Sequence, residues 1–270
     1  MSDIERPVAA DAPNEPVLQV RGATIRFGGV EALRNVDFDV RPGEIVALAG
    51  DNGAGKSTLI KVISGVYVPS AGEVRFLGER APAGDPQAVR SRGIETIYQD
   101  LALADNLDVG SNIFLGREPM KRAFGLPVID RARMAAVARE VLDRLDIHIP
   151  DKKLTGPVRM LSGGQRQAIA IGRAIYWNAK LLIMDEPTAA LGVPEQRKVM
   201  ELIRGLKSQG VAVILVSHNL HDIFGVADRI VVMRRGEMVG ERATSLTDGD
   251  EIVRLMVGDT YAATRNAGAA

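Results

Sequence analysis

The stretch EIVALAGDNGAGKSTLIKVISG, from Glu44 to Gly65, decides the fold of this chain. It begins with a short apolar run, continues through a glycine-rich turn, and ends in a segment with the apolar spacing of a helix. A strand, a tight turn and a helix in this order form a unit of a parallel α/β core. We therefore expect an α/β fold in which this stretch supplies a buried strand and the helix that follows it.

The turn contains the pattern Gly-x-x-x-x-Gly-Lys-Ser, which binds phosphate when it lies between a strand and a helix. Its glycines let successive backbone N–H groups point toward phosphate oxygens. Lys56 would reach the β- and γ-phosphates, and the Ser57 hydroxyl would coordinate Mg²⁺. The alternative is an ordinary glycine-rich turn, which the flanking strand and helix disfavour. The predicted phosphate-binding residues are Gly50, Asp51, Asn52, Gly53, Ala54, Gly55, Lys56, Ser57 and Thr58.

The segments on either side of this unit predict how the sheet is completed. Upstream, alternating apolar residues between Val17 and Val40 predict strands of an antiparallel meander at the N-terminal end. Residues from about 100 to 175 lose strand character, and the run from Asp130 has helical spacing after an acidic cap. We expect a mostly helical inserted subdomain there. Three apolar runs predict strands that return to the core sheet: KLLIMDE (180–186), VAVILVSH (211–218) and RIVVMRR (229–235).

Composition narrows the class of protein. The 270 residues are 46% hydrophobic and 25% charged, and the balanced charges give no sign of bulk nucleic-acid binding. The chain has no cysteine, which excludes disulfides and cysteine-based metal sites, and no apolar run long enough to span a bilayer. We expect residues 1–16 to form a disordered leader rather than a signal peptide, residues 17–258 to form the domain, and residues 259–270 to form a flexible tail.

A second candidate site lies at the end of the run LLIMDEP. Asp185 at the end of the strand can hold the shell of a Mg²⁺ ion, and Glu186 can point toward an attacking water. An acidic pair after a strand is by itself a weak signal, because a helix N-cap explains it equally well. Together with the phosphate loop, the pair predicts nucleotide hydrolysis.

A second stretch that can bind phosphate is LSGGQRQ, Leu161 to Gln167, which precedes the acidic pair in the chain. Its small residues come directly before an apolar helical run. This stretch resembles the signature of the ATP-binding cassette (ABC) ATPases. Other marks of that family follow the same order: Phe27 resembles the ring that stacks on adenine, Gln99 the glutamine of the Q-loop, and His218 the switch histidine. The resemblance covers Val17 to Gly258.

The resemblance implies roles for these residues. In this family two cassettes face each other head to tail, and each ATP lies between the phosphate loop of one chain and the signature of the other. Gln99 would sense Mg²⁺ and the membrane partner, and His218 would contact the γ-phosphate. The implied catalytic residues are Glu186, His218, Lys56 and Gln99; the Mg²⁺ ligands are Ser57, Gln99 and Asp185; and the signature residues that bind the partner's ATP are Ser162, Gly163, Gly164 and Gln165.

Three longer stretches, residues 27–65, 112–118 and 216–237, resemble one branch of the family. This branch contains the ATP-binding subunits of bacterial ribose-, xylose- and fructose-type importers. One set of motifs indicates a single-cassette member, which would work as a homodimer. The resemblance implies a peripheral protein on the cytoplasmic face of the inner membrane that drives an integral-membrane sugar permease, and indirectly serves a periplasmic sugar-binding protein. One departure concerns Gly192, because most of the family has Asp there, in the loop that crosses to the partner's site.

Two other functions stay open from the sequence: a soluble ABC ATPase of DNA repair or translation, and a regulatory module that binds nucleotide without hydrolysing it. If there is a permease, we expect it to contact residues 100–115, through apolar side chains such as Ile113 and Phe114. Other residues have ordinary structural interpretations. These are His148 and His221 at the surface, Tyr176 and Trp177 in packing, and MRRGE (233–237) as a solvated turn.

Overall fold

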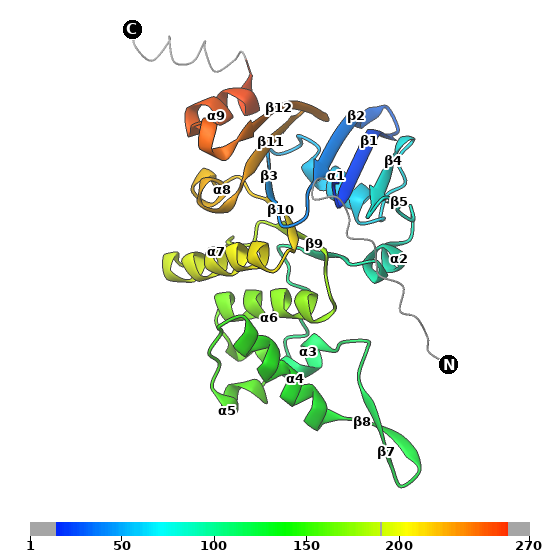
Figure 1. Ribbon diagram of the computed structural model, residues 1–270, viewed down its shortest axis with the longest axis vertical. Helices are drawn as coiled ribbons and strands as arrows, with labels where there is room; N and C mark the ends of the chain where they lie inside the picture. The colour runs from blue at the N-terminus through cyan, green and yellow to red at the C-terminus, as the bar shows by residue number, and fades with distance from the viewer. Residues whose placement is uncertain (1–14, 190, 259–270) are drawn as a thin grey trace, which may run out of the picture.

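A computed structural model describes residues 15–189 and 191–258 (Figure 1). The predicted leader up to residue 14 and the predicted tail, residues 259–270, lie outside the described residues. Within the described chain, two larger sheets pack with a helical subdomain, which carries a third sheet of two strands. None of the described helices meets the length and hydropathy that a membrane span requires.

The core sheet has six strands in the order β12-β11-β3-β10-β9-β6. All neighbours are parallel except β11 and β12. The strands are β3 (Ile45–Ala49), β6 (Ile94–Ile97), β9 (Leu181–Asp185), β10 (Ala212–Val216), β11 (Arg229–Arg234) and β12 (Glu237–Ala243). β3 and β10 are buried throughout, as continuous apolar runs predict for strands covered on both faces. The three core strands predicted downstream are therefore confirmed as β9, β10 and β11.

A second sheet of four antiparallel strands has the order β2-β1-β4-β5. Its strands are β1 (Leu18–Phe27), β2 (Val30–Val40), β4 (Ala71–Phe76) and β5 (Glu79–Arg80). The antiparallel strands predicted before Val40 are confirmed as β1 and β2. The sheet is not a simple meander, however, because β4 follows α1 (Lys56–Ile63) in the chain and pairs with the free edge of β1.

The predicted inserted subdomain is largely helical. It contains α3 (Val109–Ile113), α4 (Arg131–Arg144), α5 (Asp151–Leu154), a 3₁₀ turn (Val158–Met160) and α6 (Gly163–Tyr176). The helix predicted from Asp130 is confirmed, and the Asp130 side chain accepts a hydrogen bond from the backbone N–H of Arg133 at 3.2 Å. The expectation that this region lacks strands is wrong for β7 (Met120–Ala123) and β8 (Leu126–Ile129), which form an isolated hairpin. Two short strands joined by a two-residue turn leave too brief an alternation to detect.

The remaining helices cover the sheets. They are α2 (Pro86–Ser91), α7 (Val193–Ser208), α8 (Leu220–Val226) and α9 (Gly249–Val257), with a second 3₁₀ turn at Thr244–Leu246. Figure 1 shows α7 between the core sheet and α6, so the helical subdomain and the core share one apolar layer.

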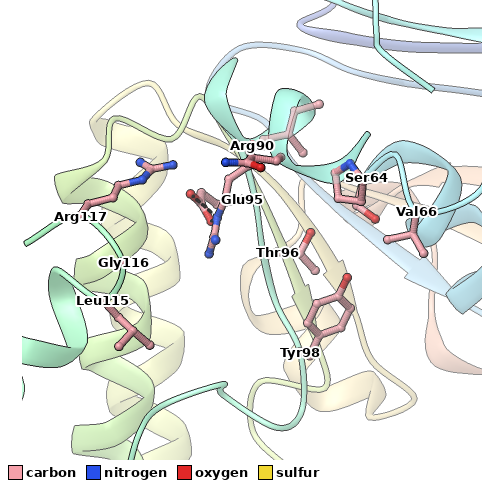
Figure 2. Close-up of a pocket in the computed structure, with 12 residues that line it drawn as sticks. Ser64, Val66, Arg90, Glu95, Thr96, Tyr98, Leu115, Gly116 and Arg117 are labelled. Atoms are coloured by element: carbon pink, nitrogen blue, oxygen red, sulfur yellow. Dashed lines mark hydrogen bonds and ion pairs between the residues drawn. The ribbon is translucent and has the colours of Figure 1, made fainter. Parts of the chain in front are cut away.

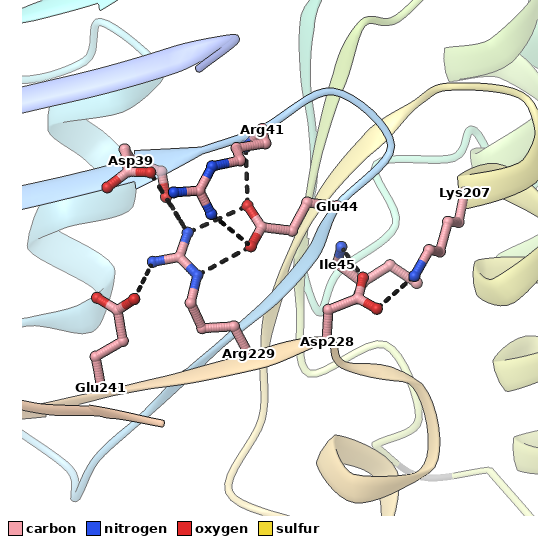
Figure 3. A network of polar contacts seen from close by, with 8 residues as sticks. All are labelled: Asp39, Arg41, Glu44, Ile45, Lys207, Asp228, Arg229 and Glu241. Atoms are coloured by element: carbon pink, nitrogen blue, oxygen red, sulfur yellow. Dashed lines mark hydrogen bonds and ion pairs between the residues drawn. The ribbon is translucent and has the colours of Figure 1, made fainter. Parts of the chain in front are cut away.

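A polar network joins the two sheets at Arg229, the first residue of β11 (Figure 3). The guanidinium donates to both carboxylate oxygens of Glu44, at 2.9 and 3.1 Å, and to the backbone oxygen of Asp39 in β2 at 2.8 Å. Glu241 pairs with it at 2.9 Å from β12. Arg229 and Glu44 are largely withdrawn from water, whereas the Glu241 side chain is 56% exposed. The buried Arg229–Glu44 pair therefore holds the start of β3, from which the phosphate loop rises, against β2.

Candidate functional site

The phosphate loop connects β3 to α1 in a conformation that glycine permits. Gly50 has a φ of 148°, and a Cβ there would lie 2.4 Å from the backbone oxygen of Met233. Gly55 has a φ of 106° and begins the helix. The Lys56 ammonium bends back over the loop and donates to the backbone oxygens of Gly50 at 2.5 Å and Asp51 at 3.0 Å. The loop thus presents backbone N–H groups and one cation beside the N-terminus of α1.

An open cavity of about 570 Å³ lies over this loop. It unites segments that are far apart in the sequence, because Gln99 follows β6 and the acidic pair ends β9. The predicted site residues that line it are Asn52, Gly53, Ala54, Gly55, Lys56, Ser57, Thr58, Gln99, Asp185 and Glu186. Gly50 and Asp51 lie beneath it as the acceptors of the Lys56 ammonium.

Glu186 and His218 are in direct contact at the edge of this cavity. The Glu186 carboxylate lies 2.7 Å from Nδ1 of His218 and accepts the backbone N–H of His218 at 3.2 Å. Glu186 itself has a φ of 51°, which is uncommon for a residue with a side chain, and its N–H donates to the Val216 oxygen at 2.8 Å. Strained backbone of this kind is concentrated at functional sites, where surrounding contacts hold it in place.

The charges in the cavity are mutually dependent. Burial raises the pKa of the Asp185 carboxyl, and the neighbouring Glu186 carboxylate raises it further. Burial also lowers the pKa of the Lys56 ammonium, while Glu186, Asp185 and Asp51 act in the opposite direction. Two carboxylates in one partly buried space repel each other, so this end of the cavity favours an added cation.

The donor set there suits Mg²⁺. Ser57, Gln99 and Asp185 offer a hydroxyl, an amide and a carboxylate in the same cavity. Mg²⁺ prefers oxygen ligands and keeps several waters, and it is held by one or two carboxylates together with substrate phosphates. The described residues contain no cluster of three His, Cys, Asp or Glu side chains, so they offer no all-protein metal cage. The residues present therefore fit a Mg²⁺ ion that arrives with a nucleotide.

The turn between β11 and β12 belongs to the site, contrary to the interpretation of MRRGE as a solvated turn. Arg235 and Gly236 line the cavity, and the N–H of Gly236 donates to the Ala54 oxygen at 2.9 Å. A Cβ at Gly236 would lie 2.9 Å from the Ala32 oxygen, so only glycine lets the turn approach this closely. The sequence analysis did not predict this turn as part of the site. It also did not predict four further residues that line the cavity, Val30, Glu31, Ala32 and Arg34. A local sequence pattern does not indicate which loops will lie against each other in the fold.

Phe27 lies outside the set of residues that line the cavity. It ends β1 with 45% of its surface exposed, and its ring meets that of Tyr67 edge-on, with centroids 5.1 Å apart. The alternative to adenine stacking was that Phe27 is a core aromatic residue, and its exposure argues against that alternative. Phe27 lies at the surface and is close in sequence to Val30, which lines the cavity. Stacking of Phe27 on a base stays a prediction.

The signature residues lie away from the phosphate loop of their own chain. Ser162 caps α6: its hydroxyl accepts the N–H of Gln165 at 3.4 Å, and the Gln165 side chain accepts the N–H of Ser162 at 3.1 Å. Gly163 and Gly164 form the first turn of this helix. Ser162, Gly164 and Gln165 line a separate cavity against α7. The two predicted phosphate-binding stretches of the chain therefore line different cavities.

Gly192 begins α7 and is capped from within the helix. Its N–H donates to the Glu195 carboxylate at 3.1 Å. The Glu195 side chain also packs beside Gly164, where a Cβ would lie 3.2 Å from that of Glu195. This loop therefore keeps a carboxylate near the signature even though Asp is absent at position 192.

The ordinary structural interpretations of the aromatic residues are confirmed. Trp177 donates from Nε1 to the Ile113 oxygen at 2.9 Å, and its ring packs edge-on against those of Tyr176 and Phe114. His148 and His221 belong to no metal-binding cluster within the part of the chain that the structure describes.

Comparison with known proteins gives consistent matches. The profile of the ABC transporter family matches residues 33–189. The chain is 46% identical over 240 residues to the xylose/arabinose import ATP-binding protein XylG of Sulfolobus acidocaldarius, covering 89% of this chain and 93% of that protein. It is 47% identical over 225 residues to the fructose import ATP-binding protein FrcA of Rhizobium meliloti, covering 82% and 86%. It is 44% identical over 232 residues to ribose import ATP-binding protein RbsA 3 of Rhizobium meliloti, but spans only 44% of that protein's length.

Solved structures agree with the fold. An ATP-binding cassette of an ABC transporter superposes with a TM-score of 0.77 at 25% identity, covering 91% of this chain and all of the other. A dimeric cassette in a post-hydrolysis state, bound to ADP and Pi, superposes with a TM-score of 0.69 at 25% identity, covering 84% and 98%. The predicted class, an α/β P-loop core with an antiparallel sheet and a helical insert, is therefore confirmed.

Proposed function

Because this chain belongs to the ABC transporter family, we propose that it binds and hydrolyses ATP to drive the uptake of a sugar through a separate membrane permease. The relatives named for xylose/arabinose, fructose and ribose import support the choice of a sugar. The observation that carries the ATPase is the cavity in which the phosphate loop, Gln99, Asp185 and Glu186 face one another.

The chemistry follows from the residues around that cavity. Backbone N–H groups of the loop and the Lys56 ammonium would hold the β- and γ-phosphates. Ser57, Asp185 and Gln99 would hold a Mg²⁺ ion, which would neutralise charge on the phosphates. Glu186 lies at the strand end, oriented by His218, and accepts the proton of the attacking water as general base. His218 then contacts the γ-phosphate.

A homodimer completes each site. Ser162 and the first turn of α6 lie away from the cavity of their own chain, so a second copy, placed head to tail, brings its α6 N-terminus to the γ-phosphate. The dimeric cassette among the similar structures supports this arrangement. Two ATP molecules then close the dimer, and hydrolysis opens it.

We propose that the permease docks in a groove of about 520 Å³ between the core and the helical subdomain (Figure 2). Figure 2 shows Thr96 and Tyr98 between the segment that carries Leu115 and the loop that carries Val66. Val66, Tyr98 and Leu115 are 42%, 38% and 49% exposed. Tyr98 precedes Gln99, which lines the nucleotide cavity, so a partner seated here touches the segment that contacts Mg-ATP. Such docking places the chain on the cytoplasmic face of the membrane, where it serves a periplasmic sugar-binding protein indirectly.

This groove replaces the expected interface at residues 100–115. Ile113 and Phe114 are 1% and 2% exposed, and Leu101 and Leu103 pack against the same core. Those side chains pack into or against the apolar cluster that the helical subdomain shares with the core sheet, so they are not available to a partner. The exposed residue of that segment that lines the groove is Leu115.

Crosslinking tests the docking site. The chain has no cysteine, so a single cysteine at Tyr98 or Leu115 is the only thiol that it presents. We expect both variants to form disulfide adducts with a co-expressed permease that carries cysteines in its cytoplasmic loops. The control is Leu246→Cys, at an 80% exposed position in the second 3₁₀ turn. Adducts at Leu246 and none at the groove positions would move the interface elsewhere.

Reconstitution tests the function itself. In proteoliposomes with the permease and the sugar-binding protein, we expect ATP-dependent uptake of a labelled pentose or hexose, and uptake at background level with Lys56→Ala. ATP hydrolysis that no permease stimulates, together with binding to nucleic acid or ribosomes, would favour the soluble repair or translation ATPase. ATP binding without turnover by the wild type would favour the regulatory module.

A further inference from the structure

The β7–β8 hairpin projects from the helical subdomain and exposes apolar side chains of its own. Figure 1 shows it projecting beyond α3 and α4, away from both sheets. Its exposed apolar side chains are Met120 (55%), Phe124 (106%), Leu126 (67%), Val128 (36%) and Ile129 (43%). An apolar cluster this exposed on a small hairpin adds nothing to the core of the chain.

The turn at the tip carries a residue that folding does not favour. Ala123 pairs with Leu126, so Phe124 and Gly125 form a two-residue turn, with φ values of 52° and 80°. Such turns favour Asn or Asp followed by Gly, because both central residues need a positive φ. A bulky side chain at the first position is strained there, and the Phe124 ring is fully exposed. Strain without a packing contact points to a function for the ring.

The segment that contains this apolar tip is basic. Between residues 117 and 133 five cationic side chains face two carboxylates, in a chain whose net charge is zero. Lys121 and Arg122 are successive residues of β7 and therefore point to opposite faces of the hairpin. Arg122 pairs with Pro127 one step behind the Ala123–Leu126 pair, and Lys121 pairs with Val128 two steps behind it. The Lys121 ammonium also lies 3.5 Å from the Asp130 carboxylate. The hairpin thus presents an apolar end with a basic collar on both faces.

We propose that the β7–β8 hairpin binds an anionic lipid surface, with Phe124 and Leu126 entering the headgroup region and Lys121 and Arg122 pairing with lipid phosphates. An apolar end backed by Lys or Arg is the pattern of segments that lie in the membrane interface. The negative potential of the cytoplasmic leaflet attracts such a cluster.

The position of the hairpin in the chain agrees with this role. It follows Leu115, Gly116 and Arg117, which line the docking groove, so a chain docked on a permease holds the hairpin beside the bilayer around that permease. The lipid contact does not depend on catalysis, since the hairpin lies outside the nucleotide cavity. It would add a second, weaker attachment to the membrane.

Vesicle cosedimentation tests the proposal with the full chain alone. We expect binding to vesicles of phosphatidylcholine mixed with phosphatidylglycerol, and weak binding to phosphatidylcholine alone. Phe124→Asn suits the turn better than Phe and keeps the hairpin folded, yet should weaken binding about tenfold through the lost apolar contact. Arg122→Glu should weaken it at least about fivefold through the charge change. Phe124→Trp should retain binding.

Two controls separate this site from general surface effects. Lys152→Glu makes the same kind of charge change on α5, at the opposite side of the helical subdomain in Figure 1, and should bind as the wild type does. All variants should hydrolyse ATP at the wild-type rate in solution. Equal binding by Phe124→Asn and wild type, or no preference for phosphatidylglycerol, would overturn the proposal. A third result would also overturn it: the wild type does not bind vesicles, and Phe124→Asn no longer associates with the permease. The partner of the hairpin would then be a protein.

Discussion

Replacing Glu186 with glutamine is expected to leave Mg-ATP binding intact and to remove nearly all ATP hydrolysis. The amide keeps the size and polarity of the side chain at the strand end, but it cannot accept the proton of the attacking water. General-base catalysis of this kind contributes a factor of about 10²–10⁴. If hydrolysis opens the dimer, as we propose, the variant should also accumulate an ATP-bound dimer that the wild type forms only transiently. Steady-state phosphate release and size-exclusion chromatography with ATP measure both effects.

The control for this substitution is Glu31→Gln. Glu31 lines the same cavity, but its carboxylate pairs with Arg26 at 2.9 Å and with Arg34 at 3.3 Å. Losing one surface carboxylate there should leave the hydrolysis rate within a few-fold of the wild type. Turnover of Glu186→Gln at a similar rate would show that another group activates the water.

Mixing two inactive variants is expected to restore one nucleotide site. Lys56→Ala removes the ammonium that binds phosphate, and Ser162→Arg places a bulky side chain at the N-terminus of α6. Each homodimer then has two damaged sites. In a mixed dimer the intact phosphate loop of the Ser162→Arg chain meets the intact signature of the Lys56→Ala chain. In a Glu186→Gln background, we expect the mixed dimer to trap about one ATP, as head-to-tail pairing requires.

The structure supplies the reason and the control. Lys56 and Ser162 line different cavities of one chain, which supports the proposal that each nucleotide lies between two chains. Ser162 also caps α6, and Ser162→Ala separates loss of the cap, worth about 1 kcal/mol, from obstruction by arginine. Ser162→Ala should still trap ATP. Mixed dimers can be identified by a different tag on each chain. If those dimers trap no ATP, both motifs act on the nucleotide of their own chain.

Much of the architecture could be predicted from local sequence because the responsible interactions are local. The phosphate loop needs glycines at Gly50 and Gly55 and a strand before them, and all of these lie within one short stretch. The helix after Asp130 is specified by apolar spacing and by its own cap. The positions of Asp185 and Glu186 at the end of a strand follow from the apolar run that precedes them.

Tertiary structure decided what depends on long-range pairing. The order of parallel strands brings Glu186 against His218, because β9 and β10 are neighbours in the sheet. Packing placed Gly236 on the phosphate loop, and Ile113 and Phe114 in the core rather than at an interface. The hairpin that carries Phe124 was missed because its alternation is short. Sequence patterns report the period of one element, whereas these contacts depend on which elements become neighbours, and that is set by burial of the whole chain.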